Sequence, residues 1–187
     1  MDNRSLTHVL QQHLRFSTRK REAEAAVLIA ITDEADPKVL LTRRSVYLSN
    51  HAGEVSFPGG KRDPQDTSNI VVALREAQEE TALNPFDVRL LGDLPMQKAR
   101  NGMLVKPIVG LIPPQVELIA QPSEIDRIFF AYFPTICCFK NLSISLINHF
   151  GWSLAIKSFA SSVTLCVTFG VLPYISFSFL SASEIGI

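Results

Sequence analysis

Apolar positions along the 187-residue chain follow two different periodicities, and each predicts a different kind of element. Residues 6–14 and 69–82 place apolar side chains every three or four positions, which predicts two helices. Ser68 precedes the second helix and suits its N-cap, because a serine oxygen accepts a hydrogen bond from a free backbone N–H. Short apolar runs predict strands at residues 25–32, 38–42, 55–57, 88–94 and 103–112.

Turn-forming residues separate several of these strands. Residues 33–37 contain Asp and Pro and predict a turn between the first two strands. Asn101 and Gly102 form a dipeptide typical of a hairpin turn, and they precede the last predicted strand. Two consecutive prolines follow that strand and end it.

Charged residues nearly vanish toward the C-terminus. Residues 1–128 hold 33 of the 36 Asp, Glu, Lys and Arg residues, whereas residues 129–187 hold three. Nine of the twelve phenylalanines and ten serines also lie in this last stretch. The composition therefore changes near residue 130, and residues 131–187 form an atypical apolar tail.

Three interpretations of this tail remain open. The abrupt loss of charge suggests an aberrant end, such as the product of a frameshift. Residues 158–183 carry no charge and are long enough to span a bilayer core of about 30 Å, which suggests a membrane segment. The third interpretation is a divergent but buried end of the domain, since an exposed tail of this composition favours aggregation.

The remaining composition limits the class of protein. The length suits one domain with a sizeable core. The formal net charge is zero, so nothing indicates bulk attraction to nucleic acid. No apolar signal-peptide core follows the N-terminus, and the three cysteines lack metal-ligand spacing, so we expect reduced thiols in a cytoplasmic protein.

The helix over residues 69–82 carries three carboxylates on one side. With about 100° per residue, Glu76, Glu79 and Glu80 fall within an arc of about 100°, away from the apolar stripe. Hard oxygen ligands clustered in this way suit Mg²⁺ or Mn²⁺, although a solvated acidic face is the plainer alternative. Arg75 lies beside this arc, where it can pair with a carboxylate and orient it.

These residues resemble the Nudix box, G-x5-E-x7-R-E-U-x-E-E-x-G-U, in which U is a bulky apolar residue. The R-E-x-x-E-E core is intact from Arg75 to Glu80, downstream of Gly60. The chain departs from the box at four places: one extra residue between Gly60 and Arg75, Asp66 or Thr67 for the first glutamate, Ala77 for the bulky apolar residue and Ala82 for the last glycine. Since that last position often needs a positive φ, alanine there costs on the order of 1 kcal/mol.

A second motif resembles the coenzyme A pyrophosphatase branch of the Nudix hydrolases. That branch carries L-L-T-x-R-S-x3-R-x3-G-x3-F-P-G-G, and this chain matches it from Leu40 to Gly60 except at Ser49, where the second Arg is expected. The one-residue insertion, in G-G-x-x-D-x-x-D, also fits this branch. The resemblance covers residues 25–130 and implies a Nudix α/β/α sandwich with a mixed sheet. It divides the chain into a helical segment 1–22, a Nudix domain 23–130 and the tail.

The resemblance implies roles for the motif residues. Glu76 and Glu80 are the expected main ligands of Mg²⁺ or Mn²⁺, Glu79 shares a second ion, and the Gly60 carbonyl completes the shell. The Gly59–Gly60 turn lets the backbone approach the metals and the pyrophosphate. Expected substrate contacts are Arg44, Lys61 and Arg62 for phosphates, and His51, which otherwise fixes its loop. The general base is Glu79 or Glu124, although Glu124 is otherwise a solvated carboxylate at the start of a helix.

The expected activity is therefore metal-dependent hydrolysis of coenzyme A to 3′,5′-ADP and 4′-phosphopantetheine. The expected partner is a small nucleotide substrate, without nucleic acid. Membrane association through residues 158–183 is the alternative to a cytoplasmic location. Two other activities stay open: a broader hydrolase of nucleoside-diphosphate-linked compounds, and an inactive Nudix-like protein whose C-terminus prevents function.

Overall fold

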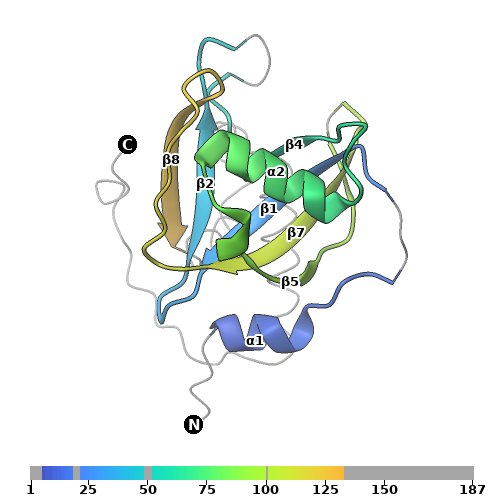
Figure 1. Ribbon diagram of the computed structural model, residues 1–187, viewed down its shortest axis with the longest axis vertical. Coiled ribbons are helices and arrows are strands. Elements are labelled where there is room, and N and C mark those ends of the chain that lie inside the picture. The colour runs from blue at the N-terminus through green and yellow to red at the C-terminus, as the bar shows by residue number, and fades with distance from the viewer. Residues whose placement is uncertain (1–5, 19–21, 49–51, 100, 133–187) are drawn as a thin grey trace, which may run out of the picture.

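The fold is known from a computed structural model that describes residues 6–18, 22–48, 52–99 and 101–132. Figure 1 shows the arrangement of its elements. In chain order they are α1 (Leu6–His13), β1 (Ala25–Thr32), β2 (Lys38–Arg44), β3 (Val55–Ser56), β4 (Gly59–Lys61), α2 (Asn69–Thr81), η1 (Pro85–Asp87), β5 (Arg89–Asp93), β6 (Gln97–Lys98), β7 (Leu104–Ile112) and β8 (Ile125–Tyr132).

β1 is the central strand of a mixed sheet that contains eight strands within the described part of the chain. It runs parallel to β7 over eight residue pairs, from Ala25 opposite Val105 to Thr32 opposite Ile112. β2 and β4 lie antiparallel to β1, and β5 lies antiparallel to the outer edge of β7. β8 pairs with β2 along its whole length. β3 pairs antiparallel with β2, and β6 pairs antiparallel with β7.

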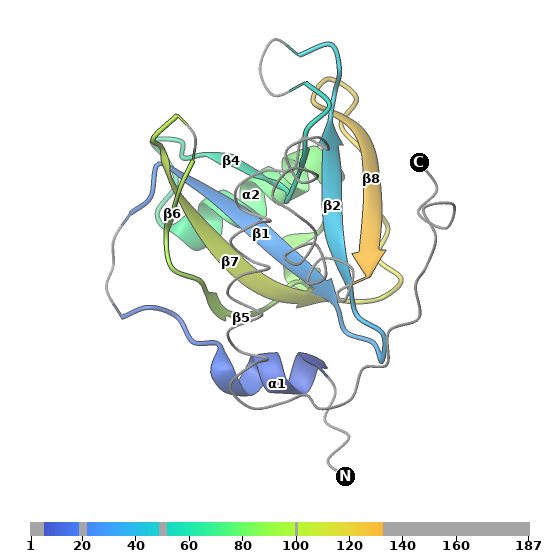
Figure 2. The ribbon, with the colours of Figure 1, turned by 180° about the vertical axis from the view of Figure 1, so that it is seen from behind.

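The sheet buries apolar side chains on both faces because alternate residues of a strand point to opposite sides. Leu28 and Ala30 of β1 pack in a cluster that includes Val72, Ala73 and Ala77, the buried apolar residues of α2. Ile29 and Ile31 pack on the other face, in a cluster that contains Leu10 of α1. Figure 1 shows α2 in front of the sheet, and Figure 2 shows it behind the strands after the molecule is turned. The predicted α/β/α arrangement with a mixed sheet is therefore confirmed.

The structure reproduces the predicted helices and strands with small changes at their ends, and it adds four elements that the apolar pattern does not predict. β4 contains Gly59, Gly60 and Lys61, which have no apolar alternation, and it is a strand because it pairs with residues 25–27 of β1. β8 crosses the position at which the composition changes, since Phe130 lies opposite Leu40 and the pairing continues to Tyr132. η1 and β6 are the other two additions.

Several expectations concern residues outside the described ranges. The apolar tail from residue 133 onward, with its cysteines and the candidate membrane segment 158–183, lies outside them, and so does His51. Within the described residues, no helix combines the length and the apolar character needed to cross a membrane.

Candidate active site

Helix α2 is capped at both ends by features of its own sequence. The Ser68 side-chain oxygen accepts a hydrogen bond from the Val71 backbone N–H over 3.2 Å, which confirms the predicted N-cap. At the other end Ala82 adopts the left-handed conformation, with φ 56° and ψ 16°. Its backbone N–H donates to the Gln78 carbonyl, as in a glycine-type helix end. The predicted positive φ at Ala82 is confirmed.

The three carboxylates of α2 differ strongly in burial. Glu80 is buried, with 3% of its surface exposed, while Glu76 is half-buried and Glu79 is exposed. Val72, Ala73 and Ala77 bury the apolar side of the helix against the sheet. The helix therefore presents one edge of its acidic face to the protein and the other edge to solvent.

Glu80 lies in a contact between the helix and β4, because Gly59 and Gly60, which were expected to form a turn, pair with β1 as a strand. Its Oε2 accepts a hydrogen bond from the Gly59 backbone N–H at 3.1 Å, and its Oε1 lies 3.8 Å from Nη1 of Arg44. Burial raises the pKa of Glu80 to about 8, because these two contacts do not compensate for the loss of water, and the nearby carboxylates Glu76 and Glu124 raise the pKa further. Glu80 is therefore a carboxylate whose charge the protein alone supports poorly.

Glu76 packs directly against Gly60. A Cβ atom at Gly60 would lie 2.4 Å from Cδ of Glu76, so no larger residue fits without moving the carboxylate. Burial raises the pKa of Glu76, against the opposing effect of the Arg75 charge. At Gly59 an added Cβ would lie 2.4 Å from the Ala26 carbonyl oxygen, so the backbone of β1 requires glycine there. Both glycines thus allow close approach, Gly59 to β1 and Gly60 to Glu76.

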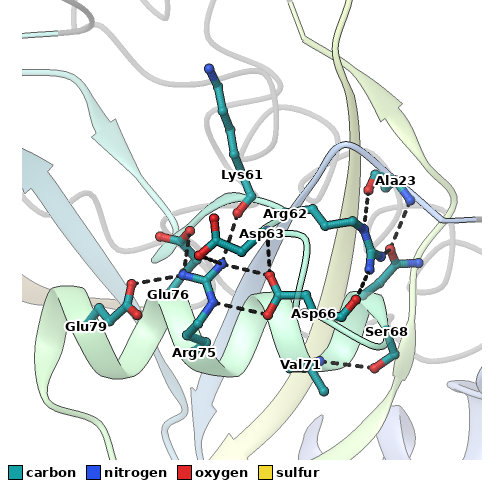
Figure 3. Close-up of polar contacts among 11 residues, drawn as sticks. Ala23, Lys61, Arg62, Asp63, Asp66, Ser68, Val71, Arg75, Glu76 and Glu79 are labelled. Atoms are coloured by element: carbon teal, nitrogen blue, oxygen red, sulfur yellow. Dashed lines mark hydrogen bonds and ion pairs between the residues drawn. The ribbon is translucent and has the colours of Figure 1, made fainter.

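Arg75 links the carboxylates of the helix to the turn after β4, as Figure 3 shows. Its Nη1 donates to Glu76 Oε1 at 3.1 Å and to Glu79 Oε2 at 3.0 Å. Its Nη2 donates to Asp66 Oδ2 at 2.9 Å and to the Lys61 carbonyl at 3.0 Å. Arg75 therefore orients Glu76 and Glu79 and holds the turn on the helix.

Arg75 has a further partner in Asp66, a residue that the comparison with the Nudix box offered only as a replacement for its first glutamate. Its two carboxylate oxygens bind Nε and Nη2 of Arg75 at 3.2 and 2.9 Å, and Oδ2 also accepts from the Asp63 backbone N–H. The hydrogen bond from Arg75 holds the pKa of Asp66 below its usual range. The available signal was the second Asp of the G-G-x-x-D-x-x-D motif.

Two side chains that were expected to bind phosphate, those of Arg62 and Lys61, have other contacts or other directions in the structure. The three guanidinium nitrogens of Arg62 donate to the Ala23 carbonyl, the Asp66 carbonyl and Oδ1 of Asn69, at 3.0, 2.8 and 2.6 Å. Arg62 thus fixes the turn between β4 and α2. Figure 3 shows the Lys61 side chain extending away from the carboxylates of α2, although its carbonyl accepts from Arg75.

Arg44 is oriented toward the carboxylates from the end of β2. Its Nε is buried and has no hydrogen-bond partner within the described part of the chain. Its backbone N–H donates to the Glu54 carbonyl and its carbonyl accepts from Gly53, so the strand end is firmly held. The guanidinium is the positive group that lies beside Glu80.

Backbone hydrogen bonds connect the segment that contains Glu124 to Glu80 and to Ser45. The Gln121 N–H donates to the Glu80 carbonyl at 3.0 Å, and the Glu124 N–H donates to the Gln121 carbonyl at 3.0 Å. The Glu124 carbonyl accepts from Ser45 N–H at 2.8 Å. Its charge contributes to raising the pKa values of Glu76 and Glu80. Strand β8 follows Glu124, so the interpretation as the start of a helix is wrong.

The arrangement of the carboxylates can be compared with that of the expected metal site. Among the described residues, no three His, Cys, Asp or Glu side chains converge in a metal-binding geometry. Arg75 contributes to this, because it holds Glu76 and Glu79 by ion pairs. The residues nevertheless fit a hard divalent cation, which would compensate the charge that burial leaves unbalanced on Glu80 and Glu76.

Comparisons with known proteins agree with this geometry. The NUDIX domain family matches residues 22–134. The "Uncharacterized Nudix hydrolase NudL" of Photorhabdus laumondii is 48% identical over 115 residues, which cover 62% of this chain and 60% of the relative. The protein of the same name from Citrobacter koseri is 42% identical over 137 residues, covering 69% and 71%. The crystal structure of the M. smegmatis Nudix hydrolase RenU covers 82% of this chain and 91% of its own, with a TM-score of 0.58 at 14% identity.

These matches differ in what they establish. The RenU structure shows the shared fold alone, because its sequence identity is low. This chain spans less than two thirds of the length of several curated relatives that it matches. The family match covers more than half of the chain and includes the whole carboxylate site. The chain therefore belongs to the Nudix family.

Proposed function

We propose that this chain is a metal-dependent hydrolase of the pyrophosphate bond in coenzyme A or its derivatives. The observation that supports the proposal is the meeting of two sequence motifs at one carboxylate. Gly59 of the F-P-G-G motif contacts Glu80 at 3.1 Å, and Arg44 of the L-L-T-x-R-S motif lies 3.8 Å from it. Residues that define the coenzyme A type in sequence therefore contact the helix that defines the family.

In the proposed reaction, a water oxygen bonds to one phosphorus while the bridging P–O bond breaks. The products are 3′,5′-ADP and 4′-phosphopantetheine. Glu76 and Glu80 would hold Mg²⁺ or Mn²⁺, with Glu79 and the Gly60 carbonyl as further ligands. A bound metal of this kind neutralises phosphate charge and lowers the pKa of a water molecule. Nudix hydrolases generally use divalent metal ions.

The chain's own residues position this chemistry. Arg75 orients Glu76 and Glu79 through its ion pairs, so we assign it a positioning role. Arg44 presents a guanidinium beside Glu80, and it is our candidate to bind the substrate pyrophosphate, because its buried Nε is left without a partner in the described residues. Gly60 lets β4 pack directly against Glu76, and Gly59 lets it pack directly against β1.

Glu124 is the better candidate for the general base. Glu79 is already engaged in an ion pair with Arg75 at 3.0 Å, so one of its carboxylate oxygens is occupied. Glu124 is exposed, lies within the electrostatic reach of Glu76 and Glu80, and is held in place by its backbone. It would accept the proton that the attacking water releases.

Two alternatives make different predictions. A broader hydrolase of dinucleotides or nucleotide sugars would turn over those compounds at least as well as coenzyme A. An inactive Nudix-like protein would show no metal-dependent turnover with any of them. Product analysis across these substrates therefore separates the three activities.

The test is turnover of coenzyme A by the purified full-length chain with Mg²⁺ or Mn²⁺. The products are separated by chromatography, and Glu80→Gln serves as the control because it removes the charge of the buried carboxylate. We expect 3′,5′-ADP from the wild type and none from the variant. If folded wild-type protein yields no 3′,5′-ADP, the assignment to coenzyme A is rejected.

A further inference from the structure

An open pocket of about 500 Å³ lies between β4, the residue before β1 and the β6–β7 hairpin. Its volume is in the range of small-molecule sites. Lys61 and Arg62 of its lining lie within the G-G-x-x-D-x-x-D motif, whereas Lys98 and Met103 belong to no motif, and we call it the hairpin pocket. The residues that matter for its chemistry are Glu24, Lys61, Arg62, Lys98 and Met103.

The unpaired charge of the hairpin pocket is positive. Within the described residues, neither the Lys61 nor the Lys98 ammonium group has an ion pair or hydrogen bond. The carboxylate of Glu24 already accepts a hydrogen bond from the Leu104 backbone N–H at 2.7 Å. Arg62 adds a third positive charge, although its nitrogens bind atoms of the chain. Two free ammonium groups beside an engaged carboxylate suit an anionic ligand.

The hairpin pocket adjoins the carboxylate site through a single strand. Gly60 packs against Glu76, and the next residue, Lys61, lines the pocket. The Lys61 carbonyl accepts from Arg75 on the side of the carboxylates, while its side chain extends the other way (Figure 3). The carboxylate site and the hairpin pocket therefore adjoin the same strand at neighbouring residues.

We propose that the hairpin pocket binds a phosphate monoester of the substrate that is separate from the pyrophosphate. Lys98 and Lys61 supply its positive charges, and Met103 provides an apolar wall beside it. The proposal rests on the proposed function, in which the 3′-phosphate of coenzyme A is a group of this class. Lys98 is then a specificity-determining residue that lies outside both sequence motifs.

The first experiment compares coenzyme A with dephospho-coenzyme A, which lacks only that phosphate. Lys98→Gln should lower the ratio of their kcat/KM values by roughly two- to fivefold, because an exposed charge pair contributes up to about 1 kcal/mol. Lys61→Gln should act in the same direction. Lys38→Gln is the matched control, since Lys38 of β2 pairs with Glu34 in the preceding turn and does not line the pocket. If Lys98→Gln leaves the ratio unchanged, the proposal is overturned.

A second experiment does not depend on turnover. Calorimetry measures binding of 3′,5′-ADP and 5′-AMP to the full-length wild type and to Lys98→Gln. We expect the wild type to prefer 3′,5′-ADP and to lose much of this preference in high salt, which screens exposed charges. Lys98→Gln should lose the preference at low salt as well. Equal binding of both nucleotides by the wild type would refute the pocket even if coenzyme A is hydrolysed, and a preference would support it even if it is not.

Discussion

The Glu80 carboxylate and the Gly59 backbone N–H, 3.1 Å apart, join helix α2 to strand β4. This hydrogen bond favours the charged form of Glu80, yet burial raises its pKa to about 8. The protein thus keeps a carboxylate that is protonated near neutral pH unless a cation is bound. This relationship makes the stability of the metal-free chain depend on pH.

The first prediction concerns that dependence. Unfolded Glu80 releases its proton near its usual pKa of 4.5, whereas the folded protein retains it up to about 8. Between these values the unfolded state binds fewer protons, so stability falls as pH rises. The free energy of unfolding of Glu80→Gln, measured in urea at pH 6 and pH 9, should lack a pH-dependent loss of roughly 2–3 kcal/mol that the wild type shows. Mg²⁺ at pH 9 should stabilise only the wild type, and parallel pH curves would contradict the argument.

The second prediction distinguishes the roles of the two glycines of β4. In Gly60→Ala the new methyl group would displace the Glu76 carboxylate, so turnover should fall roughly a hundredfold while the fold persists. In Gly59→Ala the methyl group would meet the carbonyl of Ala26, which cannot rotate away, so the fold itself should be lost. Circular dichroism and activity distinguish the two variants. Similar thermal unfolding of both would show that the contact at Gly59 is relieved at little cost.

The third prediction tests the general base. Glu124→Gln should lower kcat about a hundredfold or more and leave thermal stability unchanged, because the side chain is exposed and general-base catalysis contributes this much. Glu117→Gln is the matched control, an exposed glutamate in the same connection between β7 and β8. A larger loss of kcat in Glu79→Gln than in Glu124→Gln would assign the base to Glu79 instead.

The fourth prediction concerns the end of α2. Ala82 has a φ of 56°, which disfavours a side chain, so Ala82→Gly should raise the free energy of unfolding by about 1 kcal/mol. Gln78→Gly, at an exposed position inside the same helix, should lower it by about 1 kcal/mol because glycine is a poor helix former. Urea midpoints of the two variants should therefore shift in opposite directions. A shift of Ala82→Gly in the same direction as Gln78→Gly would refute the strain at Ala82.

Local patterns were sufficient to predict an element where that segment buries its own apolar side chains. Residues 25–32 are apolar without interruption because β1 is covered on both faces, and the predicted strand matches the observed one. The predicted helix at 69–82 differs from α2 by one residue, since Ser68 marks its start and the helical spacing continues to its end. β4 was missed because its glycines carry no periodic signal and pairing with β1 alone makes it a strand.

The sequence by itself determined the family, the helix that carries Glu76, Glu79 and Glu80, and their common side, because helical geometry depends only on spacing. The tertiary structure alone decided that Glu80 is the buried member and that Arg75 binds Asp66. It also decided that the Lys61 side chain leaves the carboxylates for a pocket formed with Lys98. Burial, charge and pKa depend on atoms that residues distant in the chain bring together, and no local pattern records those contacts.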